Sequence, residues 1–287
     1  MTDLPPPSPE ESFPAENSGS AQPSPVATTF PRPRSREAQD GAVVPPRRAG
    51  YLVPTVAPRL TYFFLGLTVL VFLAQLAGEV VFGYDVAAVL GYKDNARIVA
   101  GQYWRLVTPI FLHAGLLHIV FNMYALYALG PQIEAPYGYL RFGLIYVLSG
   151  ITGVVLSMAL NPFRSVGASG AIFGLIGALG AYLYRHRKAF GGYGQRRLTN
   201  VVTIAAINLL IGLSPGIDNW GHLGGLLGGA TLAVLIGPRL ELETDYSTGQ
   251  IAVVDQTPLA SRGIGLAAFC LGLLVLTGAV IVYRAGR

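Results

Sequence analysis

Apolar residues dominate the chain from about residue 60 onward, in seven runs separated by polar or glycine-rich segments, of which 84–115 is the longest. The runs cover Tyr62–Gly83, Leu116–Leu129, Tyr139–Leu160, Ser169–Tyr184, Asn200–Leu213, Gly221–Gly237 and Ile264–Tyr283. A helix needs about 20 residues to cross a bilayer, and the second, fourth and fifth runs are shorter than that. A short helix can end inside a bundle only if its free backbone groups meet protein or water. The pattern therefore predicts a bundle of membrane helices with an internal aqueous site.

Residues 1–59 have a different composition, rich in Pro, Ser, Ala and Arg and poor in large apolar side chains. Such a segment buries too little surface to fold alone, so we expect a disordered Pro/Arg-rich cytoplasmic tail. The runs set the other boundaries: a six-helix core over 60–237, a cytoplasmic linker over 238–263 and a seventh transmembrane helix over 264–283. The predicted fold class is an all-α, polytopic membrane helical bundle.

Composition supports a membrane protein and excludes several other classes. The chain is 52% hydrophobic and 12% charged, against about 25% charged residues in soluble domains. The net charge of +5 is not gathered on one face or arm, so we expect no nucleic-acid partner. A single cysteine, Cys270, excludes a disulfide framework and a cysteine metal site. No H-E-x-x-H motif is present, and we expect neither a metal nor a cofactor.

Basic residues predict how the bundle is oriented. Arg47, Arg48 and Arg59 precede the first run, and five further cations lie over 185–197, between the fourth and fifth runs. Because cytoplasmic loops carry an excess of Lys and Arg, both segments are predicted to be cytoplasmic. With seven spans the C-terminus is then on the outer side of the plasma (inner) membrane. His186 lies in the basic segment, where we expect it to be solvated.

Polar residues gather at the predicted outer ends of three runs. His118 stands near the start of the second run, Ser169 opens the fourth, and His222 opens the sixth. Asn122 follows His118 by one helical turn and shares its face. Ionisable residues in membrane segments are costly and usually functional. The orientation places all four residues at one membrane depth, on the outer side.

These residue types suit a serine hydrolase with its opening on the outer side. A serine hydroxyl becomes a good nucleophile when a base such as His takes its proton. Donors must also stabilise the developing oxyanion, and a helix N-terminus with Asn and His side chains offers them. We therefore predict that Ser169 and His222 form a catalytic dyad.

Small residues beside the predicted dyad indicate close helix packing. Gly170 and Gly174, and likewise Gly221, Gly225 and Gly229, form small-xxx-small patterns that let membrane helices approach closely. Gly167 and Gly170 leave room for a substrate backbone. Simpler interpretations stay open: Ser169 as a helix N-cap, and the glycines for packing alone. Asp218 either orients His222 as a third member or is a loop residue before the sixth run.

Five motifs together resemble the rhomboid family of intramembrane serine proteases. They are W-R (Trp104, Arg105), H-x4-H-x3-N (His113, His118, Asn122), G-x3-E-x3-G (Gly130, Glu134, Gly138), G-x-S-G (Gly167 to Gly170) and G-H-x-x-G (Gly221, His222, Gly225). The motifs occur in the family's order over roughly residues 60–237. The seventh run looks like the six-plus-one rhomboid layout.

The resemblance implies a role for each matching residue. Ser169 is the nucleophile, His222 the general base, and His118, Asn122 and the Ser169 amide form the oxyanion hole. Trp104, Arg105 and Glu134 are structural, and His113 is structural or organises water. The family often has Tyr four residues after the serine, packed on the imidazole, where this chain has Phe173. The implied activity is endoproteolysis of membrane-anchored substrates within or near their transmembrane segments.

Two other functions are compatible with a polar site in a membrane bundle. A rhomboid-like protein without activity would bind membrane clients, but such proteins typically lack the serine or the histidine. A transporter or channel would line a path with the same polar residues, usually near the midplane and in repeated halves. The chain shows no internal repeat, and its polar residues cluster toward one face.

Overall fold

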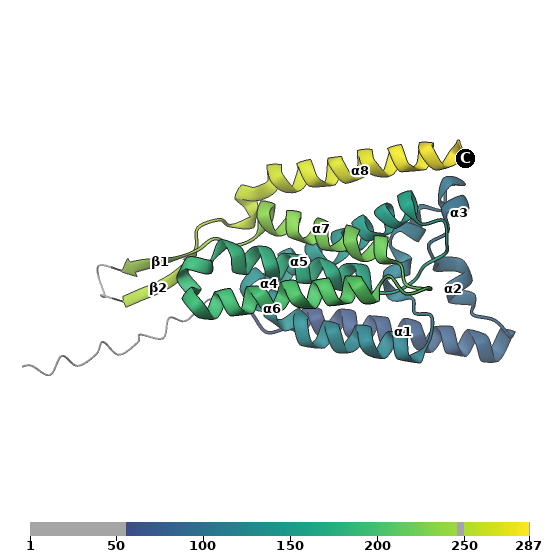
Figure 1. Cartoon of the computed structure of the whole chain (residues 1–287), viewed down its shortest axis with the longest axis horizontal. Coiled ribbons are helices and arrows are strands. Elements are labelled where there is room, and N and C mark those ends of the chain that lie inside the picture. Colours follow the sequence, from purple (N-terminus) through teal and green to yellow (C-terminus); the bar gives the residue numbers. More distant parts are fainter. Residues whose placement is uncertain (1–55, 246–249, 287) are drawn as a thin grey trace, which may run out of the picture. The chain divides into compact units, whose positions relative to one another are not determined.

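The computed structural model describes residues 56–245 and 250–286, where the chain forms eight α-helices and one two-stranded sheet (Figure 1). The helices are α1 (Arg59–Phe82), α2 (Val86–Gly91), α3 (Asn95–Val99), α4 (Leu116–Leu160), α5 (Ser169–Arg185), α6 (Arg187–Ile211), α7 (Asn219–Ile236) and α8 (Gly263–Ala285). The strands are β1 (Leu240–Asp245) and β2 (Gln250–Asp255), and short 3-10 turns are η1 (Tyr103–Leu106), η2 (Thr108–Phe111) and η3 (Leu259–Arg262). The predicted all-α membrane bundle is confirmed. The predicted tail over 1–59 lies outside the described residues as far as residue 55.

Three helical stretches are long and apolar enough to cross a membrane by length and composition: Arg59–Phe82, Leu116–Leu160 and Leu259–Ala285. As one straight helix, the 45 residues of α4 would extend about 68 Å at 1.5 Å per residue, roughly twice the thickness of a bilayer core. The helix breaks at Gly138, whose φ of 75° is easily adopted by glycine but rarely by other residues. Helix α4 therefore accounts for the second and third predicted runs.

The polar segments between the runs are more structured than predicted. Helix α6 begins at Arg187 instead of Asn200 and bends at Gly191 (φ 53°), so the basic segment is helical rather than a loop. Residues 84–115 contain α2, α3, η1 and η2. The predicted linker holds the antiparallel β1–β2 hairpin, in which Leu240 pairs with Asp255. Apolar runs predict only the parts of a helix that are buried or face lipid. Polar residues that face water can continue a helix or pair as strands without forming such a run.

Helices α5 and α7 lie side by side (Figure 1). A methyl group added at Gly225 would overlap the carbonyl oxygen of Gly170, and one at Gly229 would overlap that of Gly174. A methyl group at Gly174 would likewise overlap the side chain of Ser149 on α4. The predicted small-xxx-small faces therefore meet each other, because only glycine allows this separation.

Helix α5 lies at the centre of the bundle. Eleven of its 17 residues are buried, and its neighbours are α4, α6 and α7. Leu175 and Ala178 are fully buried in the main apolar cluster, together with Phe142 and Ile145 of α4. The burial of this helix all round explains why it is apolar on every face.

The β1–β2 hairpin is tied to the helices by polar contacts. Arg141 of α4 forms an ion pair with Asp255 (Nη1 to Oδ2, 2.7 Å). His186, between α5 and α6, is only 8% exposed, so the expectation that it is solvated is wrong. Its Nδ1 lies 3.0 Å from the carbonyl oxygen of Tyr182, and its Nε2 accepts a hydrogen bond from the Leu240 amide (3.3 Å). These two roles require a neutral ring.

We expect Gly225→Ala to destabilise the fold, because its methyl group has no space between α5 and α7. Overpacking of this kind costs about 1–3 kcal/mol. Gly272→Ala in α8 is the matched control, since a methyl group there meets nothing within 4 Å. Thermal unfolding in detergent should show a lower Tm for Gly225→Ala and no loss for Gly272→Ala. Equal effects of both substitutions would contradict the close packing of α5 and α7.

Stability should also depend on the protonation of His186. Burial, aided by Arg185 and Arg239, lowers the pKa of His186 against the opposing effects of the Tyr182 carbonyl and Asp255. As the pH falls below about 6.5, the unfolded chain binds the proton first, so the free energy of unfolding decreases. Between about pH 8 and about pH 5.5, Tm should fall less in His186→Gln, whose amide does not titrate, than in the wild type. The same pH dependence in both proteins would show that the neutral ring does not secure Leu240.

Candidate active site

Ser169 and His222 lie in the first turns of two neighbouring helices. Ser169 is the first residue of α5, and His222 is the fourth residue of α7. The Oγ of Ser169 and the Nε2 of His222 are 2.9 Å apart, which is a hydrogen-bonding distance. A neutral ring with its proton on Nδ1 can accept the hydroxyl proton at Nε2. The structure thus brings together the two residues predicted to form the dyad.

Phe173 fixes the plane of the His222 ring. It follows Ser169 by one turn of α5, and its ring stacks on the imidazole with centroids 4.4 Å apart and planes inclined by 11°. Phe173 is 5% exposed, so its position is set by the packing of α5. Among the described residues the His222 Nδ1 has no hydrogen-bond partner. Stacking, rather than a third polar residue, therefore orients the ring.

His118 and Asn122 face the same site from the first two turns of α4. The Asn122 amide donates to the carbonyl oxygen of His118 (2.9 Å). Gly167 has a φ of 132°, and a β-carbon at this position would lie 2.8 Å from the His118 ring. Gly167 is therefore needed both for the backbone turn and for the close approach of the His118 ring to the start of α5.

A cavity of about 1190 Å³ opens in front of these residues. Its lining includes five residues predicted for the site: His118, Asn122, Ser169, Phe173 and His222. Other parts of its wall come from Ile204 and Asn208 of α6 and Trp220 of α7. The candidate nucleophile thus faces a cleft whose wall includes residues of both α4 and α6, large enough for an extended peptide.

Comparison of the sequence with known proteins identifies the family of this chain. Residues 100–239 match the model of the rhomboid domain. The chain is 43% identical to rhomboid protease GluP of Bacillus subtilis (strain 168) over 183 residues. These aligned residues cover 63% of this chain and 35% of that protein. It is 42% identical over 149 residues to RHOMBOID-like protein 6, mitochondrial, of Arabidopsis thaliana, or 51% of this chain and 48% of that protein. The chain belongs to the rhomboid family. It is an integral membrane protein, and it spans between about a third and half of the length of these two relatives.

Two residues of the rhomboid domain, Trp104 and Arg105, bind the carbonyl groups of α2. Arg105 is 1% exposed and donates to the carbonyls of Tyr92 (2.8 Å) and Val89 (2.9 Å). The Trp104 indole donates to the carbonyl of Leu90 (3.0 Å). Because the last carbonyls of a helix lack partners within it, these side chains satisfy the C-terminal end of α2. Their contacts agree with a structural role in the segment between α1 and α4.

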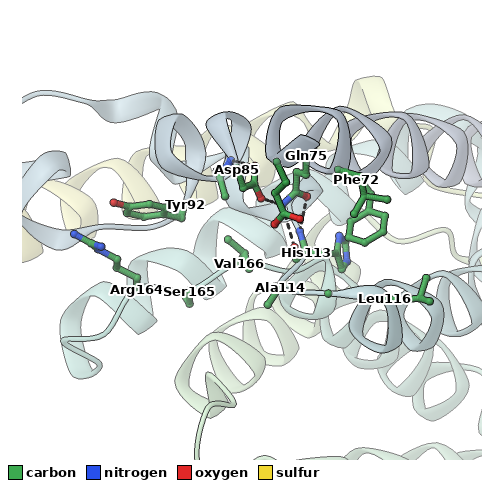
Figure 2. A pocket seen from close by; sticks show the side chains of 14 residues that line it. Phe72, Gln75, Asp85, Tyr92, His113, Ala114, Leu116, Arg164, Ser165 and Val166 are labelled. Atoms are coloured by element: carbon green, nitrogen blue, oxygen red, sulfur yellow. Dashed lines mark hydrogen bonds between the residues drawn. The ribbon is translucent and has the colours of Figure 1, made fainter. Parts of the chain in front are cut away.

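His113 links α1 to the start of α5. Gln75 of α1 accepts from the His113 amide and donates to its carbonyl, both at 3.0 Å, and it also donates to Asp85 (2.6 Å), as Figure 2 shows. The His113 Nε2 in turn lies 3.5 Å from the amide of Ala168, the residue before Ser169. Burial lowers the pKa of His113 to about 4, so the ring is neutral at physiological pH. His113 therefore acts as a spacer between α1 and the turn that presents Ser169.

The pocket beside His113 adjoins the catalytic cleft, and Ala114, Arg164, Ser165 and Val166 line both. It has a volume of about 550 Å³, and its lining includes Gln75, Asp85, His113 and Arg164 (Figure 2). Ser169 and His222 are not part of its lining. His113 thus lines this pocket and also contacts the Ala168 amide, next to the serine.

Glu134 caps the N-terminal end of α1. Its carboxylate accepts from the amides of Leu60 and Thr61, both at 2.7 Å, and from the Thr61 hydroxyl at 2.5 Å. A carboxylate is favourable at the positive end of a helix, so this buried charge fixes α1 against α4. Gly130, one turn earlier, gives the Thr61 side chain its space. These contacts agree with the structural role predicted for Glu134.

Asp218 caps α7 instead of contacting the His222 ring. Its Oδ1 accepts from the Gly221 amide (3.2 Å) and the Asn161 side chain (3.1 Å), and Ser157 donates to its Oδ2. Burial raises the pKa of Asp218, but hydrogen bonds from Ser157, Ser165 and Asn161 and the charge of Lys93 outweigh it, so the pKa lies below its usual value. Asp218 is therefore an ionised N-cap, and the hypothesis of a third catalytic member finds no contact in its favour.

Three residues that support the site, Gln75 beside His113 and Ser157 and Asn161 beside Asp218, are not among those predicted from the sequence. Gln75 offered a signal, because an amide inside an apolar run needs a partner. Ser157 and Asn161 offered only a weak one, since they stand at the end of a run where polar residues are common. Their partner Asp218 is 57 or more residues away, and such distant pairings are invisible to local patterns.

Proposed function

We propose that this protein is an intramembrane serine endopeptidase of the rhomboid type. The observation that carries the proposal is the 2.9 Å contact between the Ser169 Oγ and the His222 Nε2 inside a cleft of a membrane bundle. A nucleophile within reach of its base, with the base oriented by a third group, is the arrangement expected for covalent catalysis. The relative named rhomboid protease GluP supports the same reaction class.

The reaction begins when Ser169 attacks a peptide carbonyl and His222 accepts the hydroxyl proton at Nε2. The carbonyl oxygen becomes an oxyanion near the N-terminal end of α5, where backbone amides lack helical partners and the dipole favours negative charge. The Ser169 amide, the His118 ring and the Asn122 side chain are the proposed donors. Asn122 must turn its amide from the His118 carbonyl toward the oxyanion, which is a rotation of one side chain.

The two halves of the reaction use the same proton carrier. When the tetrahedral intermediate collapses, His222 returns the proton to the leaving amine and an acyl-enzyme remains on Ser169. Water then attacks the ester, His222 accepts a proton from it, and Ser169 recovers its hydrogen when the acid product leaves. Stacking on Phe173 holds the imidazole in place through both halves.

The proposed substrates are proteins anchored by a transmembrane helix. The amides of an intact helix are hydrogen-bonded internally, so a segment that unwinds easily should be cleaved faster. The wall of the cleft contains residues of both α4 and α6, which supports entry of the substrate segment between these helices. Neither a metal ion nor a cofactor has a part in the proposed reaction.

The proposed topology keeps the N-terminus in the cytoplasm and opens the cleft to the outer side of the plasma membrane. The helix-forming basic segment between α5 and α6 then faces the cytoplasm, in keeping with the positive-inside rule. The tail over 1–59 and the linker over 238–263 would be cytoplasmic, and the C-terminus would lie outside. This topology allows water from the outer side to reach Ser169.

The proposal predicts loss of cleavage when either dyad residue is removed. With a single-pass model substrate in liposomes, Ser169→Ala and His222→Ala should reduce the cleavage rate by about 10³-fold or more. Phe173→Tyr should keep most activity because it keeps the ring, whereas Phe173→Leu should lower it. Ser261→Ala, which removes an exposed serine of η3, is the control.

Rival functions give different results in the same liposomes. A client-binding protein without activity would retain substrate equally in wild type and Ser169→Ala and cleave it in neither. A transporter or channel would support solute flux that depends on His118 and Asn122 but not on a cleavable substrate. Equal cleavage by the wild type and both dyad variants would refute the Ser–His mechanism.

A further inference from the structure

The last turn of α4 is bonded by a cation from the C-terminal helix α8. Arg284 donates from Nε to the carbonyl oxygen of Met158 (2.7 Å) and from Nη2 to that of Ala159 (3.0 Å). The last carbonyls of a helix have no partner within it and carry partial negative charge, so a guanidinium is favourable there. Helix α8 lies outside residues 100–239, the part that matches the rhomboid domain.

A second cation, from the segment between α2 and α3, reaches the same end of α4. Lys93 is fully buried and donates from Nζ to the carbonyls of Asn161 and Phe163, both at 2.8 Å. The Asn95 side chain also donates to the Asn161 carbonyl (3.1 Å). Burial lowers the pKa of Lys93 to about 8, which still leaves the ammonium mostly charged at neutral pH. The end of α4 is thus bonded to two segments that are distant in sequence, one around Lys93 and Asn95 and the other at Arg284.

Apolar packing supports these polar contacts. Val280 of α8 forms a small cluster with Ile98 of α3 and with Val155 and Met158 of α4. Val280 and Thr277 are the buried residues of α8, while most of this helix is exposed and free to face lipid. The contact of α8 with α3 and α4 therefore begins near Leu273 and runs along the part of the helix that ends with Arg284.

The other face of the same turn of α4 holds the N-cap of α7. Ser157 and Asn161 donate to the two carboxylate oxygens of Asp218. Asp218 accepts from the Gly221 amide through its side chain and from the His222 amide through its carbonyl (3.2 Å). The backbone of His222 is therefore two hydrogen-bonded steps away from the turn that Arg284 binds.

We propose that Arg284 is a positioning residue for His222. By holding the carbonyls of Met158 and Ala159, it fixes the turn that presents Ser157 and Asn161 to Asp218, and Asp218 sets the first turn of α7. Helix α8 thereby contributes to the active site without touching substrate. This inference rests on the proposed function, because it gives His222 a catalytic role.

The test compares three variants of the full-length protein in liposomes. Arg284→Gln should lower kcat for a transmembrane substrate by about 10-fold with KM unchanged, since a small misplacement of a catalytic group is costly. Arg284→Lys, which keeps a cation near the carbonyls, should recover most of the rate. Arg262→Gln removes the cation at the opposite end of the same helical stretch and should have no effect. Tm values measured alongside show whether each variant is folded.

Hydrogen exchange at the Gly221 and His222 amides gives a readout that does not require activity. Exchange at both amides should be faster in Arg284→Gln than in the wild type, and unchanged in Arg262→Gln. Unchanged exchange, or faster exchange with unchanged kcat, would overturn the positioning role, as would a lower Tm alone or a rise in KM alone. A wild type that cleaves nothing would refute the proposed function itself, and the exchange data would still show whether α8 holds Asp218.

Discussion

The close approach of α5 and α7 is the constraint on which the rest of this structure depends. Glycines at 170, 174, 225 and 229 bring backbone against backbone, and a single added methyl group at Gly225 or Gly229 would collide with a carbonyl oxygen. At this separation the first turns of the two helices lie side by side, and the Ser169 hydroxyl reaches the His222 ring. A wider crossing would leave the serine without a base. Helix α5 is apolar on every face, and it is buried because α4, α6 and α7 surround it.

The polar residues of the bundle gather where helices begin or end. His118, Ser169 and His222 all lie in first turns, so their backbone amides and side chains converge on one cleft. Other helix ends are satisfied by side chains from elsewhere in the chain: Glu134 caps α1, Asp218 caps α7, and Arg284 with Lys93 binds the end of α4. Inside a membrane the free backbone groups at a helix end find little water to hydrogen-bond with. Each such contact therefore also fixes the position of one helix against another.

The sequence was most informative where a local signal coincides with a long-range one. The start of α5 at Ser169 is the residue predicted, because a polar residue opens an apolar run there. The glycine spacing predicts the α5–α7 contact, and the asymmetry of charge predicts that His118, Ser169 and His222 lie at one membrane depth. The start of α6 at Arg187 and the β1–β2 hairpin were not predicted, since the charged residues there carry no apolar run. Local sequence does not predict the burial of His186 or the capping role of Asp218, because their partners, Leu240 and Asn161, are more than 50 residues away.

The central claim is that the hydroxyl of Ser169 is made nucleophilic by His222 in an outward-facing cleft. Mass spectrometry of the protein after reaction with a fluorophosphonate tests it most directly, because this probe phosphonylates an activated serine without needing a substrate. The account predicts one adduct, on Ser169, which disappears in Ser169→Ala and forms far more slowly in His222→Ala. An adduct on another serine, or labelling of Ser169 at the same rate without His222, would contradict it.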